Sequence, residues 1–218
     1  MTYLGASRIL ATGLLVRPLI EIKIMDTLLL NADGQPLSHV PLSVVTWQVA
    51  VRLMFLGKVK VLKSYDEWIV RSQFLEMKVP SIVIMTEQVK WSKTLKYSRN
   101  NVYLRDDFTC QLQTSSRCKE AKGKVKLTEL TLDHVVPRSH GGKTNWLNVC
   151  TSCKTCNSDK GADHLIIPKK KPYKPTYYEI LAKRKTLPIH IRDEEWKFYI
   201  NWPEHLVKVL PQPTGPAH

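Results

Sequence analysis

The chain has 218 residues, of which 43% are hydrophobic and 24% charged, as in a folded globular protein with one compound domain or two small ones. Its 33 Lys and Arg residues against 19 Asp and Glu residues give a formal net charge of +14. This balance excludes an acidic disordered chain and favours a polyanionic partner.

The positive charge is concentrated in the middle of the chain. Residues 90–185 hold 21 basic and 8 acidic residues, a net charge of +13, whereas the rest of the chain holds 12 basic and 11 acidic residues. All five cysteines lie in the same segment. A merely solvated surface would distribute its lysines along the chain, so we expect residues 90–185 to contact the polyanion.

The N-terminal residues are not expected to direct export. Their apolar run, residues 9–20, is interrupted by Arg17 and Pro18, and no small-residue cleavage site follows it. The run is also too short and too broken to span a bilayer. An odd number of cysteines, spaced unlike a disulfide framework, indicates a reducing compartment. We therefore expect a cytoplasmic protein from a bacterial or phage-infected cell.

Residues 1–90 are predicted to form a small mixed α+β unit without a polar cluster suited to catalysis. Alternation and short apolar runs predict strands at 20–24, 27–31, 58–63 and 81–85. Pro41 and Ser43 mark the predicted start of a helix, and Gly57 its end. Apolar residues between Trp47 and Phe55 recur at helical spacing, which favours a role in the core over one in binding.

Residues 91–168 are predicted to form a second unit. Ser98 can cap a short helix, and the apolar residues 130–136 indicate a strand. Residues 146–156 continue from a turn at 139–143 into a helix that begins at about residue 157. The expected order of elements is strand, loop, strand and helix, which is a ββα arrangement.

Residues 169–218 are predicted to be a basic linker followed by a C-terminal helical tail. Lys169-Lys-Lys-Pro172 begins the linker. Asp193 can cap a late helix that carries Trp196 and Ile200. The last eight residues, 211–218, have the composition of a loose terminus.

The cysteine spacing predicts a structural zinc site. Cys153 and Cys156 form a C-x2-C knuckle, the spacing that lets two thiolates grip one tetrahedral Zn²⁺. Cys110 and Cys118 are the expected second pair, although the seven residues between them are more than usual. Cys150 also forms C-x2-C with Cys153, and we assign it the role of a small buried hydrophobe. Four cysteine ligands leave no open position, so the zinc would fold the segment, at about 10–16 kcal/mol of apparent binding free energy.

A second polar cluster has residue types that suit phosphodiester hydrolysis. Asp133 and His134 are adjacent, and Asn148, Asn157 and Lys160 follow. Hydrolysis needs an activated water and a cation against the developing charge. A neutral imidazole can take the proton of the water near pH 7, and carboxylate and amide oxygens suit Mg²⁺. The alternative for a single histidine beside an apolar strand is a structural role.

Three motifs resemble those of the HNH endonucleases of the ββα-metal superfamily, in their bacterial and phage form. They are LTLDHVVPRSHGG at residues 130–142, WLN at 146–148 and CKTCNSDKG at 153–161. The likeness extends upstream to about residue 28 and ends near residue 168. One departure is the wide spacing of Cys110 and Cys118, where the family commonly has C-x2-C.

The resemblance implies a role for each residue of the second cluster. His134 would be the general base, Asp133 and Asn157 would hold the catalytic Mg²⁺ or Mn²⁺, and Asn148 would tie down the loop and orient His134. Contacts to nucleic-acid phosphates would come from Arg138, Lys143 and Lys160. For Lys160, ordinary solvation on a helix is an equal alternative.

The expected fold class is therefore α+β, with a small mixed N-terminal unit followed by a zinc-stabilised ββα-metal nuclease domain. The expected function is a divalent-metal-dependent endonuclease that hydrolyses DNA. One alternative is a zinc-containing DNA-binding module without catalysis, and another is a nuclease directed at RNA. The carboxylate of Asp133 disfavours the non-catalytic module, because it would repel a polyanionic ligand unless a cation lay between them.

Overall fold

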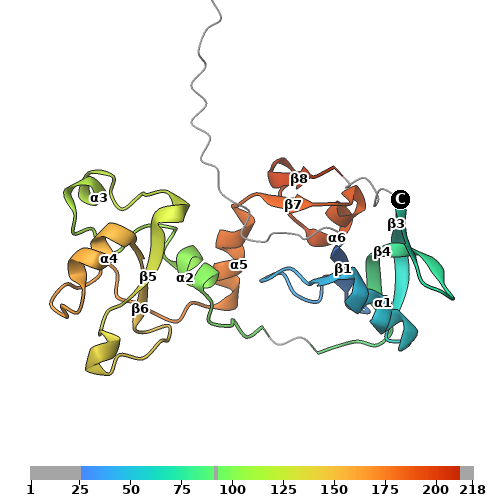
Figure 1. The fold of residues 1–218 in the computed structure, drawn as a ribbon, viewed down its shortest axis with the longest axis horizontal. Coiled ribbons are helices and arrows are strands. Elements are labelled where there is room, and N and C mark those ends of the chain that lie inside the picture. Colours follow the sequence, from blue (N-terminus) through green and yellow to red (C-terminus); the bar gives the residue numbers. More distant parts are fainter. Residues whose placement is uncertain (1–25, 91–92, 212–218) are drawn as a thin grey trace, which may run out of the picture.

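The computed structural model describes residues 26–90 and 93–211, and the elements form two units joined by a helix (Figure 1). The apolar run at 9–20, the strand predicted at 20–24 and all but the first residue of the predicted loose terminus lie outside the described residues. In the part of the chain that is described, no helix combines the length and the apolar character needed to cross a membrane.

The first unit is built on a four-stranded sheet of order β2-β1-β4-β3. Its elements are β1 (Asp26–Leu30), β2 (Val44–Thr46), α1 (Trp47–Phe55), β3 (Val59–Arg71) and β4 (Glu76–Met85). β1 pairs antiparallel with β2 and parallel with β4, while β3 and β4 form an antiparallel pair. All five residues of the central strand β1 are buried, which explains the apolar run Leu28–Leu30 without alternation.

The strand predicted at 27–31 is confirmed, but the helix predicted from Pro41–Ser43 begins later. Val44–Thr46 instead forms an edge strand paired with β1, and α1 starts at Trp47. These residues are β-branched and fit the pleated edge of the sheet, so pairing with a distant strand prevails over the local helix signal. The predicted end is right, since Gly57 follows α1 with φ +67°.

The end of the described chain packs against this sheet, and it adds two strands to the helical elements predicted for the C-terminal tail. Two strands, β7 (Ile189–Ile191) and β8 (Val207–Val209), form a parallel pair. They flank α6 (Lys197–Ile200), whose predicted cap is confirmed in part: the Asp193 side chain accepts the Glu195 N–H at the start of a 3-10 turn that leads into α6.

One apolar core holds the two ends of the described chain together. Its members come from β1, from β4, from residues 42–44 at the start of β2 and from the segment 189–207. Its buried residues are Leu28, Leu30, Leu42, Ile82, Ile189, Ile191, Trp196, Ile200 and Trp202. The Ser81 hydroxyl donates to Asp193 Oδ2 at 2.6 Å and accepts from Trp196 Nε1 at 3.0 Å. We call residues 26–90 with 189–209 the sheet unit.

The second unit, residues 94–168, has the predicted ββα order and is called the hairpin unit. Its elements are α2 (Arg99–Arg105), α3 (Ser116–Glu120), β5 (Leu130–His134), β6 (Val149–Cys153) and α4 (Lys154–Lys160). β5 and β6 pair antiparallel, and Ser98 caps α2 by accepting the Asn101 N–H, as predicted. Short 3-10 turns complete both units, at Leu127–Glu129, Arg138–His140, Glu194–Trp196 and Glu204–Leu206.

A buried guanidinium joins α2 to the rest of the hairpin unit. Arg105 is 1% exposed and pairs with the adjacent Asp106 at 2.7 Å. Its remaining nitrogens donate to the carbonyl oxygens of Trp146, Val149 and Tyr173 at 2.7–3.0 Å. A buried charge is stable only when its hydrogen-bonding groups all have partners. The contacts of Arg105 with Trp146 and Val149 therefore fix the backbone where β6 begins.

The helix α5 (Tyr177–Lys185) connects the two units and packs against α2. Ile180 of α5 enters a small apolar cluster with Val102, Leu104 and Trp146 of the hairpin unit. On the other side, Trp202 Nε1 of the sheet unit donates to the Leu187 carbonyl just beyond α5. The helix therefore contacts both units (Figure 1).

Candidate active site

The loop between β5 and β6 is closed by Asn148. Its Oδ1 accepts the Val136 N–H at 2.9 Å, and its Nδ2 donates to the carbonyl oxygens of Val136 and Lys143 at 3.1 and 2.9 Å. Gly142 makes this closure possible, since a Cβ there would lie 1.8 Å from the Val136 oxygen and 2.9 Å from Asn148 Nδ2. The resemblance implies that Asn148 ties down this loop, and its three hydrogen bonds do so.

His134 lies at the end of β5, where the strand meets this loop. The imidazole is half-buried, and its Nε2 lies 2.7 Å from Thr144 Oγ1. Burial, and then the charges of Arg138 and Lys160, lower the pKa of His134 against the opposing effect of Asp133. The ring is therefore neutral at pH 7 and able to accept a proton. Thr144 is missed by sequence reasoning because its contact crosses the loop and no spacing marks it.

Asp133 points into the protein, where Lys160 meets it. The carboxyl is 4% exposed, and Lys160 Nζ lies 3.2 Å from each of its oxygens. Burial raises the pKa of Asp133, and the Lys160 ammonium opposes that rise. The two side chains of the pair Asp133 and His134 thus lie in different environments, as alternation along a strand requires.

Lys160 is not at the surface, so the predicted phosphate contact is not available in this geometry. Its side chain is fully buried, and Nζ also donates to the His134 carbonyl at 2.8 Å. The helix α4 packs on β5 and buries the Asp133 carboxyl. If Lys160 pointed outward, that carboxyl would be buried without a counter-charge. Lys160 thus holds the side chain of Asp133 and the backbone of His134 in place.

One oxygen of Asp133 is open to a hard divalent cation. Asp133 Oδ2 is buried and accepts no hydrogen bond from any described residue, although the Lys160 ammonium is near it. Asn157 is half-buried on α4, three residues before Lys160. A carboxylate and an amide oxygen suit Mg²⁺ or Mn²⁺, which keep several water ligands. Lys160 would share the carboxylate with such a cation.

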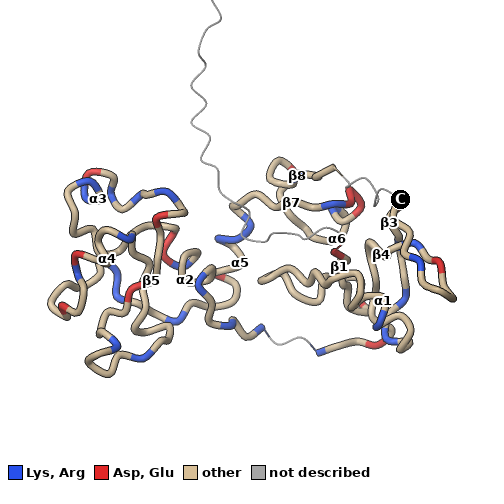
Figure 2. Tube along the Cα trace, viewed as in Figure 1, with Lys and Arg blue, Asp and Glu red and all other residues tan. Residues whose placement is uncertain are grey.

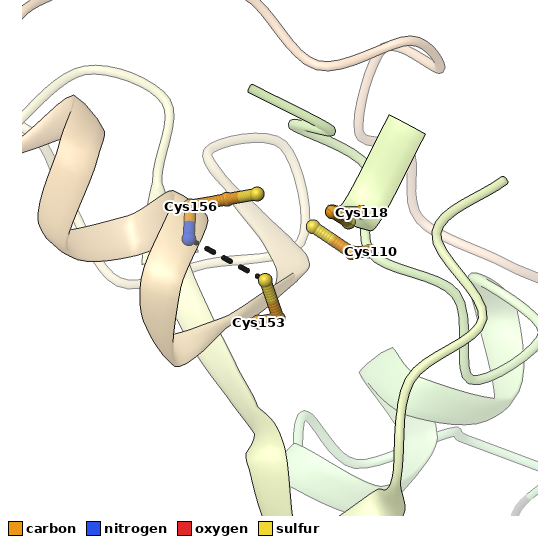
Figure 3. A group of neighbouring side chains, drawn as sticks. All are labelled: Cys110, Cys118, Cys153 and Cys156. Carbon is orange, nitrogen blue, oxygen red and sulfur yellow. Dashed lines mark hydrogen bonds between the residues drawn. The ribbon is translucent and has the colours of Figure 1, made fainter. Parts of the chain in front are cut away.

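Four cysteines gather beside the hairpin (Figure 3). The sulfur atoms of Cys110, Cys118, Cys153 and Cys156 all lie within 4.8 Å of one another, and all four residues are buried. Tetrahedral Zn²⁺ with its usual Zn–S distance requires sulfur atoms roughly 3.8 Å apart, so the cluster fits that ion. Cys150 is buried outside the cluster, opposite Asp133 in the strand register. The predicted division of the five cysteines is confirmed.

A compact turn brings Cys110 and Cys118 together despite the seven residues between them. The backbone of Cys110 donates to the Gly123 oxygen at 2.9 Å, and Gly123 donates to the Cys118 oxygen at 2.8 Å. Gly123 has φ +77°, and a Cβ there would lie 2.5 Å from the Cys110 oxygen. The helix α3 brings Cys118 back toward Cys110, so the longer sequence interval leaves the sulfur positions together.

The thiols differ in how readily they lose a proton. Burial raises the pKa of Cys118, and it raises that of Cys153 to about 11. Burial also acts to raise the pKa of Cys156, but hydrogen bonds from Ser115 and Thr114 outweigh it and lower the value to about 6. Of these thiols, Cys156 loses its proton most readily and would be the first to hold a cation as a thiolate.

Exposed cations surround the mouth of the hairpin. Arg138 and Lys143 are both exposed on the loop that Asn148 closes. Figure 2 shows further Lys and Arg positions along the hairpin unit and α5. The segment with the charge excess, residues 90–185, thus includes the unit that contains His134.

Sequence comparisons identify both units. The chain matches the family of HNH endonuclease-associated N-terminal domains over residues 27–93, and the HNH endonuclease family over residues 117–166. No match was found among curated proteins or among solved structures. The second match contains β5, β6, α4 and three of the four clustered cysteines. The chain therefore contains an HNH endonuclease domain, preceded by an HNH-associated N-terminal domain.

Proposed function

We propose that this nuclease is a divalent-metal-dependent endonuclease that hydrolyses DNA phosphodiester bonds with His134 as the general base. The observation that carries the proposal is that a half-buried imidazole with a lowered pKa and a buried carboxylate occupy adjacent positions at the end of β5, next to a loop with exposed cations. A base, a cation-binding oxygen and a phosphate-binding surface then lie within one hairpin.

The contact with Thr144 gives His134 a defined orientation. If Nε2–H donates to Thr144 Oγ1, the other ring nitrogen, Nδ1, carries the lone pair that takes a proton from water. Asn148 holds the loop that carries Thr144, which links its hydrogen bonds to the direction of the imidazole. Asn148 and Thr144 are thus positioning residues in this scheme.

Asp133 and Asn157 would hold the divalent cation, Mg²⁺ or Mn²⁺. When bound, such a cation stabilises the negative charge that develops on the phosphate and on the leaving oxygen. Lys160 keeps the Asp133 carboxyl in place and favours its ionised form, because its ammonium lies 3.2 Å from both oxygens. The cluster of four cysteines would hold a structural Zn²⁺ that fixes the junction of β6 and α4.

Exposed cations support a nucleic acid as the proposed substrate, and the likeness to HNH endonucleases favours DNA. Arg138 and Lys143 are exposed beside His134, and the surrounding segment carries a net charge of +13. The five cysteines, all free of disulfides, favour a reducing compartment such as the cytoplasm.

Cleavage of supercoiled plasmid tests the proposal. Purified protein with one equivalent of zinc is incubated with plasmid and Mg²⁺ or Mn²⁺, without added cation, and with a chelator at a concentration that leaves the zinc content unchanged. We expect nicked or linear DNA only when Mg²⁺ or Mn²⁺ is added. An RNA of matched sequence is assayed in parallel. Binding without conversion under every cation, or cleavage of the RNA alone, would contradict the proposal.

A further inference from the structure

A pocket of about 890 Å³ lies where the sheet unit meets α2 and α5. One wall is the segment 38–44 of the sheet unit, and the other is the segment 94–101 with Leu104 and Arg184. The residues of the proposed catalytic centre do not contribute to its lining. The pocket is therefore a separate feature of the junction between the two units.

Arg184 lines this pocket as a buried cation without a carboxylate partner. It is 5% exposed, and no described Asp or Glu forms an ion pair with it. The one hydrogen bond that its side chain makes with a described residue is long, 3.5 Å from Nη1 to the Pro188 oxygen. Burial lowers the pKa of Arg184 to about 10, as expected for a desolvated guanidinium.

The contrast with Arg105 shows what Arg184 lacks. Both guanidiniums are buried, but Arg105 has a carboxylate at 2.7 Å and three carbonyl acceptors, whereas Arg184 has one carbonyl and the face of Trp202, 5.1 Å from the ring centre. A guanidinium has five N–H donors in a fork that matches phosphate. The remaining donors of Arg184 are available to an anion in the pocket.

The rest of the lining suits a ligand that is anionic at one end and apolar at the other. None of the fifteen lining residues is acidic, and Lys96 supplies a second cation. Val40 and Leu42 make the segment 38–44 an apolar wall, and Leu104 adds apolar surface on the opposite wall. Burial, followed by the charge of Lys185, lowers the pKa of His39, so this ring adds a neutral polar group rather than a third charge.

We propose that this pocket binds a nucleotide, with its phosphate on Arg184 and Lys96 and its sugar and base against the apolar wall. The volume is that of a small-molecule site. The same chemistry describes a free nucleoside monophosphate and the phosphorylated end of a DNA strand. A ligand held here contacts both the sheet unit and the hairpin unit. The site is independent of the proposed cleavage chemistry.

Equilibrium binding of three small probes to the full-length protein, without added divalent cation, tests the site. The probes are deoxyadenosine 5′-monophosphate, deoxyadenosine and inorganic phosphate. We expect the monophosphate to bind at least about tenfold more tightly than the nucleoside, because a hydrogen bond to a charged group contributes that much. Equal binding of nucleotide and nucleoside, or no binding of either phosphate-containing probe, would overturn the proposal.

Three variants locate the binding. Arg184→Gln is expected to weaken nucleotide binding at least about tenfold, and Lys96→Gln to weaken it less, since Lys96 is exposed. Arg52→Gln removes an equal charge from α1, away from the pocket, and should bind as the unsubstituted protein does. If Arg184→Gln does not fold, Lys96→Gln decides. Unchanged affinity in Lys96→Gln and in any folded Arg184→Gln would overturn the site.

A competition experiment distinguishes the two sources of the nucleotide. Short single-stranded DNA with a 5′-phosphate is compared with the same strand bearing a 5′-hydroxyl. Displacement of the bound monophosphate by the phosphorylated strand alone supports a strand end as the natural ligand. Failure of both strands to displace it supports a free nucleotide. Equal displacement by both strands would contradict recognition of the terminal phosphate by Arg184.

Discussion

The two units of this protein differ in how much buried charge and sulfur their interiors contain. The sheet unit has an apolar core of leucine, isoleucine and tryptophan side chains drawn from both ends of the described chain. The hairpin unit has five buried cysteines packed together and two buried ion pairs, Arg105 with Asp106 and Lys160 with Asp133. The unit that carries the candidate catalytic residues thus adds buried charges and thiols to a small apolar cluster, whereas its neighbour relies mainly on apolar burial.

The difference follows from size and function. A segment of the length of the hairpin unit supplies little apolar core, and a metal commonly replaces it in such small units. The ion pair of Lys160 and Asp133 also lies next to His134, so the same groups that stabilise the hairpin determine where the imidazole points. Stability and function are coupled in the hairpin unit, and we expect them to be separable in the sheet unit.

Loss of the cysteine cluster should have the largest effect on stability. We expect Cys156→Ser to abolish zinc binding and to unfold the hairpin, because structural zinc contributes about 10–16 kcal/mol. Hydrogen exchange should become fast at 130–134 and 149–153, while the amides of β1 and β4 stay protected. Zinc content and exchange are measured together.

Cys150→Ala is the matched control, since Cys150 is equally buried but outside the cluster. It should keep one equivalent of zinc and cost about 1–2 kcal/mol for the lost packing. Loss of zinc from this variant, or its retention in Cys156→Ser, would show that the ligands are assigned wrongly.

Breaking the buried ion pair should have the next largest effect. Lys160→Met leaves the Asp133 carboxyl buried without its partner, and we expect it to lower the free energy of unfolding by about 3–5 kcal/mol. The double variant Asp133→Leu with Lys160→Met should recover most of that loss, because neither charge remains buried. Urea unfolding checks both values. A single variant as stable as the parent would mean that the pair does not hold the hairpin.

A substitution in the sheet unit should cost less and leave the zinc in place. Trp196→Phe removes the hydrogen bond to Ser81 and part of a fully buried side chain, and we expect a loss of about 2–3 kcal/mol. Phe198→Ala, two residues away and 84% exposed, should change the unfolding free energy by under about 0.5 kcal/mol. Similar values for the two variants would refute the common core of the two chain ends.

The smallest effects are expected for single exposed cations. Arg138→Gln and Lys143→Gln should each weaken DNA binding and reduce the slope of log affinity against log salt by about 1, if each contacts one phosphate. Lys60→Gln, an exposed cation on β3 of the sheet unit, should leave the slope unchanged. An equal reduction by Lys60→Gln would place the DNA surface on both units.

The features that could be predicted from the sequence are those carried by short spacing. The Ser98 cap, the ββα order and the separation of Cys150 from the other four cysteines all follow from residues close together in the chain. The return of segment 189–209 to the sheet could not be predicted, because it depends on contacts such as Lys63 with Glu195, 132 residues apart.

The candidate site shows the same division. His134, Asp133 and Asn148 are found from motifs, whereas the contact of Thr144 and the inward direction of Lys160 depend on how a loop and a helix pack on β5. A lysine on a short helix can point toward solvent or toward the protein interior, and sequence alone favours the orientation toward solvent. The buried carboxyl of Asp133 reverses that preference.

The central claim is that His134 performs the chemistry of a hairpin that zinc and an ion pair hold in place. Plasmid cleavage with Mg²⁺ is measured for His134→Ala and for His164→Ala, an exposed histidine in the same unit, with the zinc content of each determined. We expect His134→Ala to retain its zinc and lose about 10²–10⁴-fold in rate, while His164→Ala cuts like the parent. A zinc-loaded His134→Ala protein that cleaves at the parental rate would contradict the claim.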